Sequence, residues 1–184
     1  MISSALTAIT RKKESVPARH LSQTLDMNGL TTILDWGCGH GADVKFYKGL
    51  GDHLMVKGYD PGADLDHSMG FDLLPDELSR WNVITCFYVL NVLPTKKERI
   101  ACLQKAAPYM SMASKMYIAV RSRQDIEKSK TIHWKKFRDG YLTSRNTFQR
   151  GFTQAELTAL VKASGLVCAR PWSKSGFVGC VALS

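Results

Sequence analysis

One short stretch of the sequence, residues 33–41, constrains the fold of this chain more than any other. Apolar residues lead into Asp35, and glycines follow at every second position, beginning with Gly37 and Gly39. An apolar run before a glycine-rich turn predicts the end of a buried strand, followed by a helix that begins near Ala42. Because glycine has no Cβ, the backbone of the turn can approach a ligand closely. The stretch therefore predicts a strand, a ligand-binding turn and a helix in succession.

Two classes of cofactor are bound by turns of this kind, dinucleotides and S-adenosylmethionine. The turn fits the dinucleotide pattern G-x-G-x-x-G/A, which alone is a weak signal. The carboxylate of Asp35 would repel a pyrophosphate, but it suits the cationic amino group of a methionine moiety. A second apolar run, over residues 54–59, ends at Asp60, roughly twenty residues beyond the glycines, where an acid at a strand end binds ribose hydroxyls. We therefore expect S-adenosylmethionine as the cofactor, with an ordinary glycine-rich loop as the alternative.

Strand and helix patterns alternate along the rest of the chain. The nearly continuous apolar runs at residues 81–90 and 116–120 predict strands that are buried on both faces of a parallel sheet. Two capping boxes, at residues 95–98 and 153–156, predict two helix starts. The elements expected at the two ends are a helix capped by Ser15 and a closing hairpin over residues 166–172 and 176–183.

Length and composition favour a single domain without disulfides or metals. At 184 residues the chain is long enough to bury a core of its own. Its five cysteines are odd in number, scattered and never spaced as C-x-x-C, so we expect reduced thiols, a cytoplasmic-type compartment and no metal site. No apolar run approaches the length of a membrane span, and no apolar segment follows the basic residues near the N-terminus. Neither a membrane protein nor a secretory signal is therefore expected.

The positive charge of the chain is unevenly distributed. The formal net charge is +9, and residues 121–150 hold nine Lys and Arg against three Asp and Glu. Trp134, Phe137, Tyr141 and Phe148 are interleaved with these cations. Basic residues mixed with aromatic residues suit contact with phosphates and stacking on bases. The segment predicts a nucleic-acid partner, with a solvated basic insertion as the alternative interpretation.

The turn and the acid that follows it resemble motif I of the class I S-adenosylmethionine-dependent methyltransferases, which reads D-x-G-x-G-x-G. The order of the predicted elements is also similar to that family. The resemblance implies an α/β, Rossmann-like class I methyltransferase fold, with a mostly parallel central sheet, a C-terminal antiparallel hairpin and helices on both faces. It implies one domain over residues 1–184, in which 1–14 form a basic N-terminal arm and 121–150 a basic aromatic insertion over the site.

A narrower resemblance rests on several short blocks in a fixed order. The chain is similar to a family of small methyltransferases found in phages and near DNA-phosphorothioation genes, whose substrate is itself inferred. It departs from the family in having Trp36 where Tyr is expected and Asn146 where Gly is expected. The blocks are R-K-K-E-S-V-P (11–17), L-D-W-G-C-G (34–39), G-Y-D-P (58–61), Y-V-L-N-V-L-P (88–94) followed by Glu98 and Arg99, and T-F-Q (147–149).

The class I resemblance implies a cofactor site around the glycine turn and the ends of the next strands. Asp72 follows the acidic patch after Asp60 and would lie near the adenine amino group, with a surface turn acid as the alternative. The residues expected to contact the cofactor are Asp35, Gly37, Cys38, Gly39, Asp60, Pro61, Asp72 and Phe87.

The acceptor is expected at the carboxyl ends of the central strands, where this fold gathers its ligands. Methyl transfer from a sulfonium is an in-line displacement, so positioning matters more than acid–base chemistry. Asn91, Tyr88 and Arg121 are the candidate catalytic residues, which would orient an acceptor nitrogen or oxygen or hold an anionic group. Two alternatives stay open, that Asn91 caps a turn and that Tyr88 belongs to the core. The candidate substrate-binding residues are Arg123, Thr147, Gln149 and Phe148, which would stack on a base or else anchor the insertion.

These features predict a methyltransferase that acts on a nucleic acid, with DNA favoured as the partner. The N/D-P-P-Y motif of exocyclic-amine DNA methyltransferases is missing, and no Pro-Cys dipeptide is present for a cysteine nucleophile. The alternatives are a small-molecule or peptide methyltransferase, a non-catalytic cofactor-binding regulatory protein and, more remotely, a nicotinamide-linked oxidoreductase. The acceptor atom and the oligomeric state are not predicted.

Overall fold

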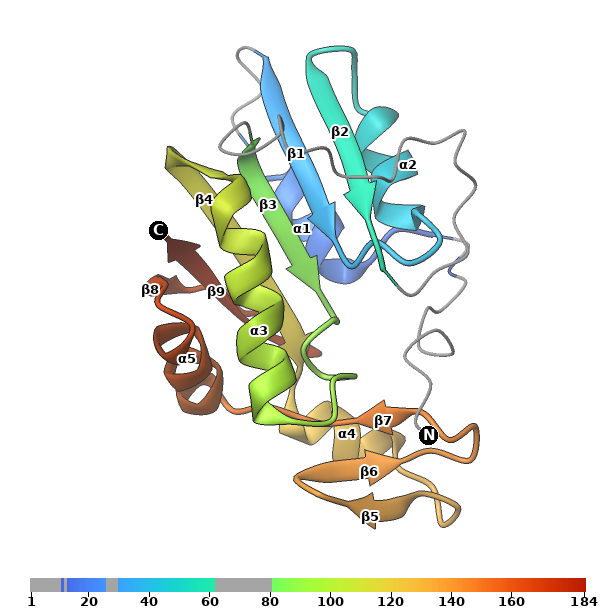
Figure 1. Ribbon diagram of the computed structural model, residues 1–184. Coiled ribbons are helices and arrows are strands. Elements are labelled where there is room, and N and C mark those ends of the chain that lie inside the picture. The colour runs from blue at the N-terminus through green and yellow to red at the C-terminus, as the bar shows by residue number, and fades with distance from the viewer. Residues whose placement is uncertain (1–10, 12, 26–29, 62–80) are drawn as a thin grey trace.

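A six-stranded sheet forms the centre of the protein (Figure 1). The computed structural model describes residues 11, 13–25, 30–61 and 81–184. The strands of the sheet are β1 (Thr31–Trp36), β2 (Leu54–Tyr59), β3 (Trp81–Phe87), β4 (Met110–Arg121), β8 (Val167–Pro171) and β9 (Phe177–Leu183). Their order is β2–β1–β3–β4–β9–β8; β1 to β4 are parallel, and β9 is antiparallel to both β4 and β8. The expected mostly parallel sheet with a closing antiparallel hairpin is confirmed.

Helices cover both faces of this sheet, as expected (Figure 1). The helices α1 (Val16–Ser22) and α2 (Ala42–Lys48) lie on one face, and α3 (Lys96–Ala106), the 3₁₀ turn η4 (Ala107–Tyr109) and α5 (Gln154–Ala163) on the other. Each face has its own apolar cluster. Along β3, Val83 and Phe87 belong to the α1–α2 cluster, whereas Ile84 belongs to the α3–α5 cluster. Burial on both faces explains why this strand is almost continuously apolar.

The helix starts that the sequence predicts are confirmed by side-chain caps. The Ser15 hydroxyl accepts a hydrogen bond from the Ala18 N–H and caps α1. Both capping boxes are complete: the N-cap threonine of α3 and of α5 accepts from the amide three residues on, and the glutamate there accepts from the threonine amide. Such caps satisfy amides at the start of a helix that have no partner within it. Local sequence therefore fixes where these three helices begin.

The strand β3 is shorter than the apolar run 81–90 predicts. It ends at Phe87 because Tyr88 has a φ of 62°. This value lies in the left-handed region, which few residues other than glycine adopt. The chain then turns, and Leu90 is completely buried outside the strand. The strand β4, in contrast, begins six residues before the predicted run, at Met110. The turn at Tyr88 changes the direction of the chain beside the glycine turn.

The basic segment between β4 and α5 folds into a small unit of its own. Its elements are α4 (Arg123–Ser129) and a three-stranded antiparallel sheet of β5 (Lys135–Phe137), β6 (Gly140–Leu142) and β7 (Phe148–Gln149). Figure 1 shows this unit below the carboxyl ends of the parallel strands. Strands of two or three residues are too short to reveal their period in a sequence, which is why none was predicted here.

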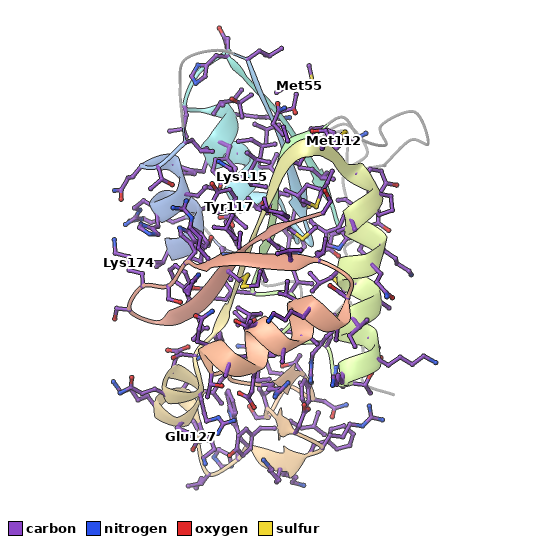
Figure 2. The ribbon with its side chains drawn as sticks, turned by 90° about the vertical axis from the view of Figure 1, so that its left-hand side faces the viewer. Met55, Met112, Lys115, Tyr117, Glu127 and Lys174 are labelled. Atoms are coloured by element: carbon purple, nitrogen blue, oxygen red, sulfur yellow. A yellow bond between two sulfur atoms is a disulfide. The ribbon has the colours of Figure 1, made fainter. Side chains whose placement is uncertain are left out.

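Two of the cysteines are bonded to each other. Cys168 of β8 and Cys180 of β9 form a disulfide, with their Cα atoms 6.1 Å apart, across the hairpin that lies beside α5 in Figure 2. The expectation that all five thiols are reduced is therefore wrong for this pair, and cysteine content no longer argues for a reducing compartment. Hairpin pairing brings together two residues that look scattered along the chain. Cys38, Cys86 and Cys102 are free thiols.

Candidate functional site

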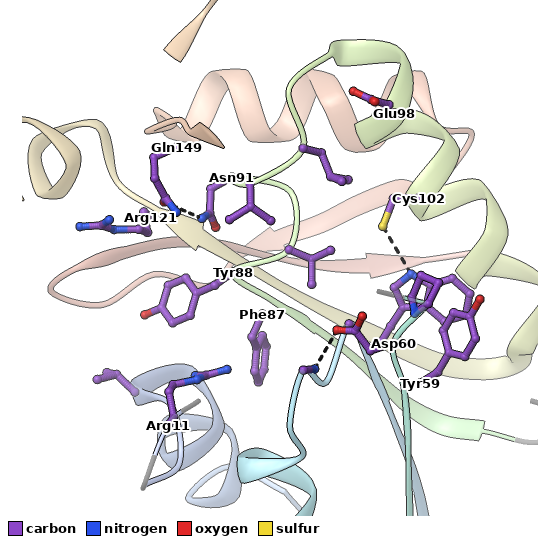
Figure 3. A pocket seen from close by; sticks show the side chains of 18 of the residues that line it. Arg11, Tyr59, Asp60, Phe87, Tyr88, Asn91, Glu98, Cys102, Arg121 and Gln149 are labelled. Carbon is purple, nitrogen blue, oxygen red and sulfur yellow. Dashed lines mark hydrogen bonds between the residues drawn. The ribbon is translucent and has the colours of Figure 1, made fainter. Parts of the chain in front are cut away.

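A cavity of about 770 Å³ opens at the carboxyl ends of the parallel strands. Its walls include residues that directly follow β1, β2 and β3, namely Gly37, Asp60 and Tyr88, together with Arg121 at the end of β4 (Figure 3). The strand order reverses between β1 and β3, because the chain passes from β1 outward to β2 and then returns to the other side of β1. In open α/β sheets, ligands bind in the crevice at such a switch point.

The glycine turn forms one wall of this cavity and is held in place by β2. The Gly37 N–H and the N–H after it donate to the Tyr59 carbonyl at 2.7 and 3.1 Å. The Gly39 N–H donates to the Asp60 carboxylate at 2.8 Å. Both glycines have positive φ, 80° and 54°. A Cβ on Gly37 would lie 2.3 Å from a methyl group of Val89, whereas one on Gly39 would extend into open space. The turn therefore needs glycine at both positions, for packing at the first and for ligand access at the second.

The structure brings most of the expected cofactor residues onto the cavity wall. Asp35 and Cys38 are exceptions, because their side chains are buried beneath the turn and do not line the cavity. Asp72 lies outside the described residues. The expected cofactor residues that line the cavity are Gly37, Gly39, Asp60, Pro61 and Phe87.

Asp35 occupies an unusual position for a carboxyl group. Its side chain is 3% exposed and accepts a hydrogen bond of 2.7 Å from the Thr85 hydroxyl. Burial, with the nearby Asp43 carboxylate, raises the pKa of Asp35 to about 7, although the Thr85 hydrogen bond and the Arg11 charge oppose this. Asp35 is not among the residues that line the cavity, so the contact between Asp35 and a ligand ammonium stays a prediction.

Replacing Asp35 with asparagine is expected to remove a pH dependence of stability. The unfolded carboxyl titrates near its ordinary pKa of about 4, whereas the folded pKa is about 7. Between these values the native state binds more protons than the unfolded state, so the free energy of unfolding falls as pH rises, by up to about 1.4 kcal/mol per pH unit. Urea unfolding of both proteins from pH 5 to 8 measures this difference. Parallel stability curves for the two proteins would contradict the prediction.

Three of the residues expected at the acceptor come together on the opposite side of the cavity. Asn91, Gln149 and Arg121 all line it (Figure 3). The Asn91 Nδ2 donates to the Gln149 Oε1 at 3.3 Å, and the Arg150 N–H donates to the Asn91 carbonyl at 2.8 Å. The Asn91 Oδ1 is buried and has no hydrogen-bond partner among the described residues. A buried oxygen without a partner is costly unless a ligand supplies a donor.

Tyr88 and Arg121 complete this side of the cavity. Tyr88 is half-buried and lines the cavity, so its side chain does not belong wholly to the core. Burial raises the pKa of its phenol to about 12. The phenol therefore keeps its proton near neutral pH and can donate a hydrogen bond. The Arg121 guanidinium is held by Asp125 at 2.6 Å and by the Ser129 hydroxyl at 2.5 Å, so its position is fixed by α4.

The other expected substrate residues do not reach the cavity. Phe148 is completely buried and packs against Phe137, with the Arg99 guanidinium 5.6 Å from its ring centroid. It anchors the insertion, and the expectation that it stacks on a base is wrong. Thr147 is also buried, where its hydroxyl bonds to that of Thr143 at 2.8 Å. Arg123 is exposed, pairs with Glu156 at 2.7 Å and lies outside the cavity.

Several cavity residues were missed in the sequence. Arg11 belongs to a short basic run that carries no helix or strand period, so its pattern does not predict a place in the cavity. Trp36 and Tyr59 end two neighbouring strands and pack against each other, with ring centroids 4.6 Å apart. The Trp36 Nε1 donates to the Cys102 sulfur of α3 at 3.4 Å. The sequence predicts these aromatic residues only as parts of strands. Their position at a strand end beside the glycine turn is the signal that could have placed them in the cavity.

Metal and membrane features are absent from the part of the chain that the structure describes. Within residues 11, 13–25, 30–61 and 81–184, no three His, Cys, Asp or Glu side chains are grouped so that they could hold a metal ion. Over the same ranges, no helix has both the length and the apolar content to cross a membrane.

The sheet order, the glycine turn and the cavity at the switch point define the class I methyltransferase fold, and solved structures of that class are similar to this chain. One is a 1,6-didemethyltoxoflavin-N1-methyltransferase from Burkholderia thailandensis, at 15% identity and a TM-score of 0.64 over 93% of this chain and 79% of that one. A methyltransferase from Methanosarcina mazei has 15% identity and a TM-score of 0.63 over 94% and 98%. The O-methyltransferase of neocarzinostatin biosynthesis has 16% identity and a TM-score of 0.63 over 91% and 55%, so this chain spans about half its length. At these identities the likeness establishes the fold.

No protein-family model matches the chain, and no curated protein matches it in sequence. The narrower resemblance to phage and DNA-phosphorothioation-associated methyltransferases therefore has no support beyond its short sequence blocks.

Proposed function

We propose that the protein is an S-adenosylmethionine-dependent methyltransferase. The observation that carries this proposal is the glycine turn on the cavity wall, where Asp60 accepts the Gly39 N–H and still faces the cavity. Two of the similar structures support the choice of cofactor, since one contains S-adenosylhomocysteine and another S-adenosylmethionine.

The residues present fit this cofactor. The cavity volume of about 770 Å³ lies within the usual range of small-molecule sites. The space that a Cβ on Gly39 would fill is open, so a ligand can approach the backbone there. Asp60 offers a carboxylate to ribose hydroxyls, and Phe87 and Val89 offer an apolar surface. When bound, S-adenosylmethionine supplies a methyl group on a sulfonium, which an acceptor displaces in line.

The chain itself would orient the acceptor. The Asn91–Gln149 pair presents a fixed amide edge, and the Asn91 Oδ1 can take a hydrogen bond from an acceptor N–H or O–H. Tyr88 stays protonated near neutral pH and can donate to an acceptor oxygen. Because both groups are held by the turn after β3 and by the insertion, the acceptor would meet a preorganised surface.

A small molecule with polar edges is the acceptor that the cavity favours. The acceptor side is a recess within one chain, with amide, phenol and guanidinium groups on its wall. The similar structures include one bound to 1,6-didemethyltoxoflavin and one bound to 2-hydroxy-5-methyl naphthoic acid. Both of these ligands are small ring compounds, which supports the same class of acceptor here.

A nucleic acid, with DNA foremost, is the second candidate acceptor, and the net charge of +9 is the observation that favours it. Two features of the insertion count against it. Arg123, Arg150 and Lys130 are paired with carboxylates of the same chain at 2.7 to 2.9 Å. The buried Phe148 also leaves the insertion without the base-stacking ring that was expected.

Two measurements test the proposed function. The first is thermal unfolding with S-adenosylhomocysteine at about 100 times its dissociation constant, which should stabilise the protein by about 2.7 kcal/mol and raise the Tm by roughly 5–10 °C. NAD should leave the Tm unchanged. The second is transfer of label from S-adenosylmethionine to metabolite, RNA and DNA fractions. We expect label in the metabolite fraction; salt-sensitive labelling of DNA would favour the second candidate, and no stabilisation with no label in any fraction would refute the proposal.

Replacing Asn91 with alanine should lower kcat/KM about tenfold, because one hydrogen bond that orients the acceptor is lost. The affinity for S-adenosylhomocysteine should not change. Asn82→Ala is the matched control, because Asn82 is exposed at the other end of β3, where its side-chain oxygen accepts hydrogen bonds from the Thr32 N–H and hydroxyl. Rates measured on the labelled fraction test this prediction. Equal rates for the Asn91 and Asn82 variants would remove Asn91 from the acceptor site.

A further inference from the structure

Arg11 contributes to the cavity a guanidinium group of which one nitrogen, Nη1, has no hydrogen-bond acceptor among the described residues. Its side chain lines the cavity beside the glycine turn and is 29% exposed (Figure 3). The Arg11 Nη1 is buried, and no described residue accepts a hydrogen bond from it. A buried charged donor without an acceptor is costly, and a ligand anion would remove that cost.

The nearest carboxylate does not fill this role. Asp43 lies 3.7 Å from the Arg11 Nη2, which is an ion-pair distance but too long for a hydrogen bond. The Asp43 oxygens already accept from the Ser15 N–H at 2.6 Å and from the Ser15 hydroxyl at 2.8 Å. Asp43 therefore anchors the chain beside Ser15 and holds the guanidinium near the cavity. The Arg11 Nη1 is left without an acceptor among the described residues, and the residue lines the cavity.

The position of Arg11 relative to Asp60 indicates which part of a ligand it meets. In the view of Figure 3, Phe87 lies between Asp60 and Arg11. A cofactor whose ribose hydroxyls bind Asp60, and whose chain crosses the turn, would direct its amino-acid end toward Arg11. That end carries a carboxylate, which a guanidinium binds with two parallel hydrogen bonds.

We propose that Arg11 binds the carboxylate of the methionine arm of S-adenosylmethionine. This assignment rests on the proposed function. It gives the N-terminal arm a defined task, because the residue that recognises the amino-acid end of the cofactor lies before α1 and outside the glycine turn. A carboxylate on the acceptor has the same chemistry, so the experiment must separate the two sources.

The test is calorimetric titration of the full chain with two ligands, S-adenosylhomocysteine and its decarboxylated analogue, which keeps the amine. Arg11→Ala should weaken S-adenosylhomocysteine binding about 10- to 100-fold, the range for hydrogen bonds to a charged group. It should leave binding of the decarboxylated analogue within about threefold of wild type. Arg11→Lys should recover part of the loss, because it keeps the charge but not the paired geometry.

Arg19→Ala is the matched control. Arg19 lies on α1, is exposed and pairs with Glu14 at 2.5 Å, away from the cavity, so its loss should change neither affinity. The assignment is overturned if Arg11→Ala binds S-adenosylhomocysteine as wild type does, or if it weakens both ligands equally, as a general loss of structure would. If wild type binds neither ligand, the proposed function itself fails. Unfolding curves without ligand show whether each variant is folded.

Discussion

Replacing Asp139 with alanine is expected to lower the free energy of unfolding by about 3–5 kcal/mol, or roughly 10 °C in Tm for a chain of this length. The reason is Arg99, a guanidinium that is 0% exposed. It donates to the two Asp139 oxygens at 2.6 and 2.9 Å, and its Nε donates to the Leu93 carbonyl at 2.9 Å. Without Asp139, the buried charge would keep, among the described residues, only the Leu93 carbonyl and the rings of Phe148 and Phe152 as partners.

Replacing Arg99 in place of Asp139 should lower the free energy of unfolding by less. Asp139 is 43% exposed and also pairs with Arg150 at 3.2 Å, so Arg99→Met leaves a carboxylate that has water and another cation. Partial burial alone would raise the pKa of Asp139, but the hydrogen bond and charge of Arg99 and the charge of Arg150 outweigh it and lower the pKa. The double variant should be more stable than Asp139→Ala alone, because it removes the buried charge. Urea unfolding of the three variants gives the coupling energy; additive losses would contradict this account.

This ion pair shows what the sequence can and cannot predict. A capping box at residues 95–98 places the start of α3 correctly, because the two residues that form it are three positions apart. Nothing in that local pattern reveals that the next residue, Arg99, is fully buried. Its partner lies forty positions later, in a turn of the insertion. Contacts between segments that are distant in sequence decide such burial, and a single sequence does not contain them.

The cofactor side of the cavity was easier to predict than the acceptor side. The turn, the helix after it and Asp60 follow one another within about thirty residues, so their spacing alone predicts that they meet. Asn91 and Gln149 are 58 residues apart, and the sequence marks both as candidates but does not predict their hydrogen bond. Phe148 is next to Gln149 in a strand, so the two side chains point to opposite sides and only one of them can face the cavity. Which of the two side chains faces the cavity depends on how β7 pairs with β6.

Asp60→Ala is expected to weaken S-adenosylhomocysteine binding about 100-fold. Two ribose hydroxyls would donate to this carboxylate, and each hydrogen bond to a charged group is worth roughly 1.5–3 kcal/mol. A total loss of about 2.7 kcal/mol in binding free energy corresponds to a hundredfold weaker affinity. The same substitution removes the acceptor of the Gly39 N–H, so the turn also loses a contact that holds its shape. Calorimetric titration measures the affinity. Asp52→Ala is the matched control, because Asp52 is an exposed aspartate before the other end of β2.

A direct role for Asp60 differs from a purely structural one in its dependence on the ligand. The 2′-deoxy analogue of S-adenosylhomocysteine lacks one of the two hydroxyls, so wild type should bind it more weakly than the parent compound, by roughly tenfold. Asp60→Ala should bind both compounds with nearly equal affinity, because the partner of that hydroxyl is gone. If the variant kept the wild-type ratio, Asp60 would act only by holding the Gly39 N–H. Asp60→Asn should fall between, because its amide oxygen still accepts one hydrogen bond but carries no charge.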